Sequence, residues 1–292
     1  MNKKILVLGG NGFVGRHAVT HLNSVGAKVT IGTRNPKRNE GSTTQAKYRL
    51  EDLTHRSDWE SAALEYDVIL NCVGILRQRV GETYDAIHHL APQAIAKACS
   101  STNTRYVHVS ALGLSVEAKS RFLTSKFTGE KAIMNSGCDW VIVRPSLLDG
   151  EGGYGAGWLR GIAKSPIFIV PNSAKGRIAA LTVEDAGAAL TKLCISSAVD
   201  LDLVNARVFE LGGEESHSFE EYIRGIRKRY SSSKSLCVTI PGWLARIGAH
   251  ICDLLHFSPF SLGHWELLCK DNVPINNKLP TLLGRAPTKV VS

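Results

Sequence analysis

A glycine-rich run near the start of the chain has the residue types and spacing to hold a phosphate group. It reads Gly9-Gly10-Asn11-Gly12-Phe13-Val14-Gly15, follows an apolar run and opens an amphipathic helical pattern. That order matters because glycines let the backbone approach a pyrophosphate, and the first turn of a helix presents free N–H groups to it. Strand, turn and helix stand in the order that a dinucleotide-binding turn requires. We therefore predict such a turn, against the alternative of a glycine-rich turn that binds no ligand.

The residues after the second apolar run indicate which dinucleotide fits. An NAD site usually carries Asp or Glu there for the ribose 2′-hydroxyl. This chain reads Gly32-Thr33-Arg34-Asn35-Pro36-Lys37-Arg38, with no acid before Glu40. Arg34 can fork onto a 2′-phosphate, with Arg16 or Arg38 assisting. We predict NADP(H) as the cofactor, with NAD(H) less favoured; the alternative is a solvated basic loop.

Short apolar runs alternate with helical patterns through the first two-thirds of the chain. The expected strands are residues 4–9, 28–32, 48–50, 67–73, 106–109 and 140–143, and the expected helices are 13–25, 57–65, 84–99 and 120–136. Alternation of this kind implies a parallel sheet with helices on both faces. Residues 151–156 are glycine-rich, and we expect them to form a loop.

The later part of the chain is predicted to complete the sheet and to cover one edge of it. A helix over 182–196 with Thr182 as N-cap, a strand over 207–211 and a helix over 218–230 with a Ser218–Glu221 capping box are expected there. The predicted fold class is α/β: a Rossmann-type doubly wound parallel sheet with a small, mostly helical C-terminal cap. Residues 1–150 form the dinucleotide-binding core, and residues 151–292 supply the remaining sheet elements and the cap.

Composition and charge narrow the class of protein. With 292 residues, 43% hydrophobic and 21% charged, the chain is an ordinary globular protein rather than a collagen, a disordered chain or a disulfide miniprotein. The net charge of +9 points to an anionic partner. Seven cysteines without a CxxC pair favour free thiols in a reducing compartment. The apolar run after Lys3-Lys4 ends in glycines, and no run reaches the ~18–20 residues of a bilayer span, so we expect a cytoplasmic chain, peripheral at the inner membrane where it contacts one.

Several motifs in order resemble the short-chain dehydrogenase/reductase superfamily, in its extended and atypical branches. Beside the glycine turn, the resemblance rests on Leu50-Glu51-Asp52-Leu53, Asn71-Cys72-Val73-Gly74, Val107-His108-Val109-Ser110-Ala111, Lys126, Arg144-Pro145-Ser146, Leu181-Thr182-Val183-Glu184-Asp185-Ala186, Val208-Phe209-Glu210-Leu211-Gly212-Gly213 and Leu279-Pro280-Thr281-Leu282-Leu283-Gly284. Within this superfamily the chain is most similar to bacterial relatives of the NADPH-binding accessory subunit of mitochondrial complex I.

The resemblance implies contacts along the adenosine half of the cofactor. Asp52 would meet the adenine amino group, with Leu53 beside the ring. Val73 and Gly74 would line the adenosine ribose. These roles come from the resemblance and place both motifs at the carboxyl edge of the sheet.

The resemblance also implies a catalytic end, and there the chain departs from the family. Lys126 would hold the nicotinamide ribose, and Pro145 with Ser146 would lie beside the carboxamide of the nicotinamide. Ser110 would polarise a substrate carbonyl. The family's Tyr-x-x-x-Lys dyad reads Phe122-Leu123-Thr124-Ser125-Lys126 here, so a phenyl ring replaces the proton donor. Such a donor contributes ~10²–10⁴ in rate.

Two functions follow from this departure. The first is an NADP(H)-binding protein without turnover, an accessory or assembly factor for respiratory complex I or quinone metabolism. The alternative is an active NADPH-dependent reductase or nucleotide-sugar epimerase-like enzyme, in which Tyr84 or Tyr154 supplies the missing hydroxyl. An unknown small molecule, apolar with an anionic group, would occupy a pocket formed by Leu76, Arg77, Leu112, Phe122, Leu147 and Tyr154.

A basic stretch precedes an amphipathic aromatic pattern in the C-terminal part. Residues 222–252 carry Arg224, Arg227, Lys228, Arg229, Lys234 and Arg246 and no acid, while Trp243, Ile247, Ile251 and Leu254 follow helical spacing. The pattern fits an anionic membrane surface or a membrane protein complex. The alternative is a solvated face followed by a core-facing helix. On the first interpretation, charge reversal at Arg227 and Arg229 removes docking without lowering the melting temperature.

Other candidate sites are weaker. His17 and His21 have the i,i+4 spacing of a metal pair but no third ligand, and the adjacent His88 and His89 point different ways, so we predict no metal site. The chain has no GxSxG elbow. It has no RNA-binding motif either, and we expect no nucleic acid partner.

Overall fold

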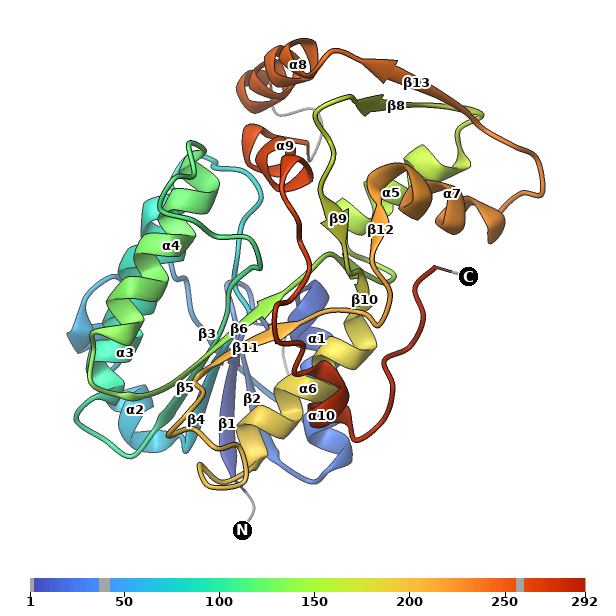
Figure 1. The fold of residues 1–292 in the computed structure, drawn as a ribbon. Coiled ribbons are helices and arrows are strands. Elements are labelled where there is room, and N and C mark those ends of the chain that lie inside the picture. The colour runs from blue at the N-terminus through green and yellow to red at the C-terminus, as the bar shows by residue number, and fades with distance from the viewer. Residues whose placement is uncertain (1–2, 37–42, 256–259, 292) are drawn as a thin grey trace.

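A parallel sheet forms the centre of the molecule (Figure 1). The computed structural model describes residues 3–36, 43–255 and 260–291. Within them, seven parallel strands follow the order β11-β6-β5-β4-β1-β2-β3. The strands are β1 Lys4–Leu8, β2 Lys28–Thr33, β3 Thr44–Lys47, β4 Val68–Asn71, β5 Arg105–Val109, β6 Asp139–Pro145 and β11 Val208–Leu211. The order reverses between β1 and β4, which opens a crevice at their carboxyl ends. The predicted Rossmann-type doubly wound fold is confirmed.

Helices bury both faces of this sheet. Successive side chains of a strand point to opposite faces, and in β1 the pair Ile5 and Val7 packs into one core while Leu6 and Leu8 pack into the other. One face carries α1 Phe13–Ser24, α6 Val183–Ile195 and α10 Leu279–Leu283, and the other carries α2 Glu60–Glu65, α3 Ala91–Cys99 and α4 Arg121–Met134. Strands that are apolar on both sides therefore account for the two helical layers.

Side-chain caps fix where three of these helices begin. The Ser120 hydroxyl accepts from the Leu123 N–H at the start of α4. Thr182 caps α6, and the Ser218–Glu221 capping box opens α7 Phe219–Lys228. The predicted Thr182 cap and Ser218 capping box are confirmed. Each cap satisfies backbone N–H groups that have no partner inside the helix.

Three predicted boundaries are wrong. The third strand is β3 Thr44–Lys47 rather than residues 48–50, because Tyr48 turns inward and its ring stacks on Trp59 at 5.4 Å. The predicted helix 84–99 is divided into a π-helical turn, η2 Ala86–Leu90, and α3. Pro92 has no N–H to bond the carbonyl of residue 88, and that carbonyl lies against Gly129 of α4. The expected loop 151–156 gives way at Tyr154 to α5 Tyr154–Lys164.

A cap of helices and short strands covers the carboxyl edge of the sheet. Its helices are α5, α7, α8 Gly242–Leu255 and α9 Leu262–Cys269, and the π-turn η2 and the 3-10 turn η1 Arg56–Asp58 belong to the layer below. Its strands are β7 Leu148–Asp149, β8 Ile167–Pro171, β9 Arg177–Ile178, β10 Leu181–Thr182, β12 His217–Ser218 and β13 Leu236–Ile240. The helical cap is confirmed, and the pairs β8–β13, β9–β12 and β7–β10 add to it. Among the described residues, no helix combines the length and apolarity needed to cross a bilayer.

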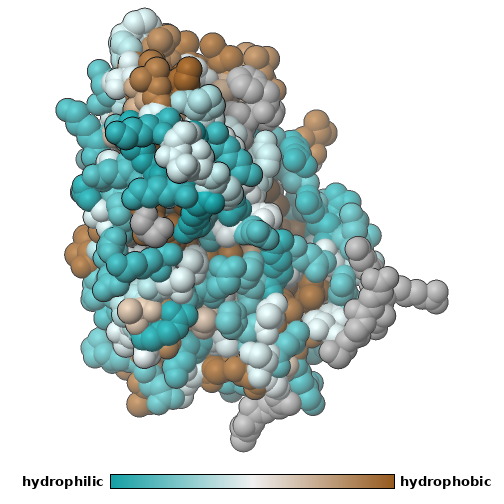
Figure 2. Space-filling model, turned by 90° about the vertical axis from the view of Figure 1, so that its right-hand side faces the viewer, coloured by the Kyte–Doolittle hydropathy of each residue, from teal (hydrophilic) through white to brown (hydrophobic). Residues whose placement is uncertain are grey.

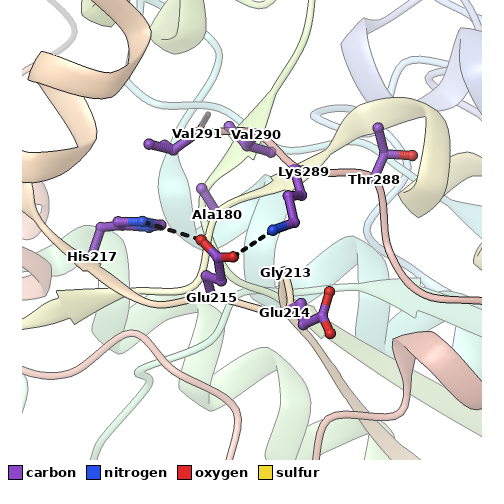
Figure 3. Close-up of a pocket in the computed structure, with 9 residues that line it drawn as sticks. All are labelled: Ala180, Gly213, Glu214, Glu215, His217, Thr288, Lys289, Val290 and Val291. Atoms are coloured by element: carbon purple, nitrogen blue, oxygen red, sulfur yellow. Dashed lines mark hydrogen bonds and ion pairs between the residues drawn. The ribbon is translucent and has the colours of Figure 1, made fainter.

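Residues 285–291 fasten the cap to the sheet layers. Arg285 donates to Asp185 of α6 at 2.5 Å, and the Thr288 N–H donates to the same carboxylate at 2.6 Å. Lys289 pairs with Glu215 at 2.7 Å, beside a small hollow of about 10 Å³, room for one water at most (Figure 3). Val290 is buried in the core of the cap with α5 and α7. We call residues 285–291 the fastening segment.

Candidate functional site

The glycine turn lies between β1 and α1 at the centre of the carboxyl edge. Gly9 has φ +73°, a left-handed conformation that favours glycine. A Cβ on Gly15 would overlap the Gly9 carbonyl oxygen, so Gly15 allows α1 to start directly against the turn. The N-cap of α1, Gly12, has no side-chain bond, and the first turn holds no acid. The free N–H groups and positive end of α1 are therefore open to an anion.

One large cavity of about 830 Å³ runs from this turn to the cap. Its walls include Gly9, Asn11, Gly12, Phe13 and Val14 of the turn. They also include the whole substrate pocket expected from the sequence, namely Leu76, Arg77, Leu112, Phe122, Leu147 and Tyr154. Beyond these residues the cap adds largely apolar walls, Trp158, Leu159, Ile178, Phe219, Phe260, Leu267 and Leu268. The site thus has a phosphate-binding end and an apolar end.

The end of the cavity beside the glycine turn, where we predict the adenosine half of the cofactor, carries charges of both signs. Arg34 lines the cavity beside the glycine turn, and its guanidinium pairs with the carboxylate of Glu82. Arg79 and Glu82 exchange backbone hydrogen bonds and both line the cavity as well. Arg16 lies elsewhere: its guanidinium sits over the Phe13 ring at 5.8 Å and donates to the Glu151 carbonyl, outside the cavity wall. Arg38 lies outside the described residues.

The predicted adenine contacts, Asp52 and Leu53, are not among the residues that line the cavity. Asp52 is paired with Arg49 at 3.0 Å, and Leu53 packs into the core beside Trp59. The neighbouring side chain, Glu51, lines the cavity instead. The roles of Asp52 and Leu53 at an adenine ring stay predictions.

Ser110 and Lys126 lie in the part of the cavity where we predict the nicotinamide half of the cofactor, and the Lys126 ammonium sits over the Phe122 ring at 5.8 Å. Ser110 follows β5, and its buried Oγ has no hydrogen-bond partner among the described residues. Lys126 is buried on the inner side of α4, and desolvation lowers the pKa of its ammonium to about 8, against the raising effect of Glu130. Glu130 itself pairs with Arg144, so Lys126 has no carboxylate within ion-pair distance in the described chain. Such groups fit a bound polar ligand, because buried donors and acceptors are otherwise paired.

The remaining predicted contacts are brought to the same place. Val73 and Gly74 lie just past β4, where the Val73 N–H donates to Asn71 Oδ1 at 3.0 Å. A Cβ on Gly74 would lie 3.6 Å from Lys126 Nζ, so this backbone borders the ammonium. Pro145 ends β6 and lines the cavity with Ser146. These residues fit a dinucleotide that runs from the turn toward Ser110.

Phe122 stands at the centre of an aromatic cluster. Its ring meets Tyr84 edge-on at 5.8 Å and His88 at 5.7 Å, and it stacks on His264 at 5.6 Å. His88 Nε2 accepts from the Ile75 N–H at 3.1 Å, and burial lowers the pKa of His88 well below its ordinary value. Burial likewise lowers the pKa of His264 to about 4. Both imidazoles around Phe122 are therefore neutral near pH 7.

The two tyrosines proposed as substitutes differ in placement. The Tyr84 hydroxyl donates to the Leu76 carbonyl at 2.9 Å, and burial raises its pKa to about 12. Tyr154 begins α5 on the exposed rim of the cavity. The Tyr84 hydroxyl is thus engaged in a hydrogen bond within the cavity wall, whereas Tyr154 lies at the solvent-exposed entrance of the cavity.

Several cavity residues carry no signal in the sequence. Glu82, His264 and Asn272 come from segments without a motif, and distant contacts bring them to the site. Asn272 Nδ2 donates to the Leu112 carbonyl at 3.0 Å, while its Oδ1 accepts from the Ser146 hydroxyl at 2.7 Å. The described residues hold no group of three or more His, Cys, Asp or Glu placed to hold a metal ion.

The basic stretch 222–252 is used mainly inside the cap, which corrects the docking prediction for its arginines. Arg227 is buried and donates to the carbonyls of residues 163–165 at 2.8–3.0 Å. Arg224 pairs with Glu220, and Arg229 pairs with Asp149. Charge reversal at Arg227 would remove these internal bonds, so we now expect it to lower the melting temperature. The alternative of a core-facing helix is also wrong, because Trp243 and Ile247 of α8 are exposed.

Comparisons with known proteins agree with this geometry. A family described as NAD(P)H-binding matches residues 9–161. The chain is 26% identical over 224 residues to the ceramide reductase of Caulobacter vibrioides, covering 76% of this chain and 68% of that protein. It is 29% identical over 152 residues to the mouse mitochondrial NADH dehydrogenase [ubiquinone] 1 alpha subcomplex subunit 9, covering 50% of this chain and 40% of the mouse protein. The match to the mouse subunit thus spans less than half of that protein's length.

Solved structures share the fold over nearly the whole chain. An NADPH-dependent quinone oxidoreductase from Escherichia coli, complexed with NADPH, matches with TM-score 0.71 and 16% identity over 98% of this chain and 96% of that one. A UDP-glucuronic acid 4-epimerase from Bacillus cereus, in complex with UDP-glucuronic acid and NAD, matches with TM-score 0.66 and 14% identity over 98% and 94%. At these identities the likeness concerns the fold alone.

Proposed function

The chain belongs to the NAD(P)H-binding family, and from this premise we propose that it binds NADP(H) in the large cavity as an accessory protein without turnover of its own. The observation that carries the proposal is Phe122, which stands one helical turn from Lys126 where the reaction needs a proton donor. Ser110 and Lys126 then serve to bind, with Lys126 on the nicotinamide ribose. When bound, the cofactor would offer a hydride at the apolar end.

The choice of NADP(H) rests on Arg34 and Arg79. Both line the adenosine end, and Arg34 already holds one carboxylate, that of Glu82. A 2′-phosphate carries more negative charge and more acceptor oxygens than a carboxylate, so it competes well for the same guanidinium. Calorimetry should show NADPH binding at least about tenfold tighter than NADH, a difference of about 1.4 kcal/mol. Arg34→Asp should narrow or reverse the ratio, and equal wild-type affinities would contradict the proposal.

Loss of turnover follows from the protonation states around Phe122. A carbonyl that receives hydride must also receive a proton. The two histidines beside Phe122 are neutral, the Tyr84 hydroxyl is engaged with the Leu76 carbonyl, and in this proposal the Lys126 ammonium is taken up by the nicotinamide ribose. We expect no NADPH oxidation above background with aldehydes, ketones or quinones, measured by loss of NADPH absorbance.

Phe122→Tyr is the test of that expectation. It places a hydroxyl beside Ser110 and Lys126, so a trace of activity should appear. Phe122→Leu, which adds no hydroxyl, is the matched control and should stay inactive. Robust wild-type turnover that Ser110→Ala abolishes would overturn the proposal.

A working reductase is the second candidate, and the apolar end of the cavity favours it. Trp158, Phe219 and Leu268 extend the walls well past the nicotinamide end, which suits an apolar substrate carbonyl. The relative named ceramide reductase supports a lipid as that substrate. In this case the Lys126 ammonium, buried beside the reaction site, is a better donor than Tyr84, and Tyr154 is the next. Turnover of a keto-lipid that Ser110→Ala removes without weakening NADPH binding would select this candidate.

The relatives named as NADH dehydrogenase [ubiquinone] subunits support a place near respiratory complex I or quinone metabolism. We propose that the chain works in the cytoplasm, peripheral at the inner membrane. Co-purification of a tagged chain with membranes, and with complex I activity in the same fraction, tests this location. Recovery wholly in the soluble fraction would contradict it.

A further inference from the structure

Helix α8 exposes its large apolar side chains and buries its small ones. It buries two small residues, Ala245 and Ala249, and exposes large apolar side chains on the opposite side. Those side chains are Trp243, Leu244, Ile247, Ile251, Leu254 and Leu255, with exposed fractions of 44–77%. At about 100° per residue they occupy one stripe of the helix, opposite the two alanines. Helices of globular proteins normally turn such a stripe toward the core.

The strand pair β8–β13 extends the same surface. Phe168 and Val170 of β8 point into the cap core, and the alternate residues Ile167 and Ile169 point outward. They pair across the ladder with Leu236 and Val238, and all four outward side chains are 38–61% exposed. Strand β13 runs directly into α8. Figure 2 shows apolar side chains gathered at the end of the molecule where Figure 1 places α8, β8 and β13.

The charges of the segments that carry this surface favour one kind of binding partner. The two segments that carry this surface, residues 164–175 and 228–255, contain a single acid, Asp253, and it is paired with Arg77. Lys164, Lys175, Lys234 and Arg246 are exposed cations in the same segments. An apolar face with a tryptophan, carried by segments whose exposed charges are cationic, suits the interface of an anionic bilayer. Two copies of the chain placed face to face would instead bring like charges together.

We propose that α8 and the outer face of β8–β13, together the apolar face, dock onto an anionic lipid bilayer. The helix lies in the plane of the interface with Trp243 and Ile247 among the acyl chains. Asp253 of α8 pairs with Arg77 in the cavity wall and accepts from the Leu262 N–H that begins α9. Because α9 supplies His264, Leu267 and Leu268 to the cavity, docking sets the apolar end of the site next to the lipid. This rests on the peripheral location proposed above and deepens it by naming the surface that contacts lipid, while it requires no bound nucleotide.

Flotation with vesicles tests the proposal on the full chain. Wild type should float with phosphatidylcholine–phosphatidylglycerol vesicles, bind phosphatidylcholine alone more weakly, and lose affinity as salt rises. The double variant Trp243→Gln, Ile247→Gln should lose at least about tenfold in partitioning, because it removes two large apolar side chains from the interface. Both residues are exposed, so the variant should keep wild-type NADPH affinity and melting temperature.

A matched control replaces exposed apolar side chains elsewhere. Val199→Gln, Ile275→Gln changes residues that are 88% and 98% exposed but lie outside the apolar face, and it should float like wild type. Absence of flotation with the anionic vesicles, or equal flotation of the two double variants, would overturn the proposal. The proposal would also be overturned if wild type self-associates in sedimentation but does not bind vesicles, and the Trp243→Gln, Ile247→Gln variant no longer self-associates. NADPH affinity measured on the same samples tests the proposed function separately.

Discussion

Glu82 competes for the guanidinium that a 2′-phosphate would bind. Its carboxylate pairs with Arg34 across 48 residues of chain and lies at the adenosine end of the cavity. Glu82→Gln removes a negative charge that NADPH must displace and that also repels the 2′-phosphate. We expect NADPH to bind about threefold to tenfold tighter and NADH to change little, measured by calorimetry.

Asp85→Asn is the control for Glu82. This nearby acid pairs with His89 and lies outside the cavity wall, so its neutralisation should leave both affinities as they are. A Glu82→Gln variant that gains equally for NADPH and NADH would show that its charge does not select the cofactor.

The Lys126 ammonium gives the site a pH dependence. Burial lowers its pKa from 10.5 to about 8, so the unbound site loses this positive charge as pH rises through about 8. A neutral amine attracts the dinucleotide less strongly than an ammonium. The dissociation constants of NADPH and NADH should therefore both increase above about pH 8, and Lys126→Met should remove that increase.

A shorter ligand separates Lys126 from the other groups. Adenosine 2′,5′-bisphosphate reaches the adenosine end but lacks the nicotinamide ribose, so its affinity should not follow the Lys126 titration. The same loss of affinity for this ligand above pH 8 would assign the titration to another residue.

Between α5 and α7, one buried arginine adds hydrogen bonds to a hydrophobic contact. Arg227 lies in the last turn of α7 and donates to the carbonyls of Ala163, Lys164 and Ser165, where α5 ends. Arg227→Ala leaves these buried acceptors unpaired and should lower the free energy of unfolding by about 2–4 kcal/mol. Urea denaturation measures the change. Lys234→Ala, at an exposed position, should stay within about 0.5 kcal/mol of wild type, and an equal loss in both variants would contradict this role.

Local patterns predicted the elements that carry the cofactor. The turn from Gly9 to Gly15, the cap at Thr182 and the capping box at Ser218 each depend on residues within one turn of chain. The Arg34–Glu82 pair and the position of His264 depend on how distant segments pack. The spacing of residues in the sequence therefore does not predict them. In α8 the spacing of apolar residues predicts an amphipathic helix, but it does not predict which side of the helix is buried. Ala245 and Ala249 form the buried side of α8, and this places the Trp243 side outside.

The fastening segment holds cap and sheet together as one molecule. Gly225 of α7 makes room for it, because a Cβ there would overlap the Val291 side chain. Gly225→Ala should therefore lower the free energy of unfolding by about 1–3 kcal/mol. Gly161→Ala, also inside a cap helix but with open space around its Cβ, should be neutral or stabilise by up to about 1 kcal/mol. Equal changes in the two variants, measured by urea denaturation, would contradict this account.

Synthesis order gives the fastening segment a second consequence. Translation proceeds from the N-terminus, so residues 285–291 leave the ribosome after every element that they contact. A nascent chain arrested with this segment still in the exit tunnel can already pair β11 with β6. It cannot yet join Arg285 to Asp185 or Lys289 to Glu215. The contacts that tie the cap to the sheet layers through this segment can therefore form only after translation has passed residue 291.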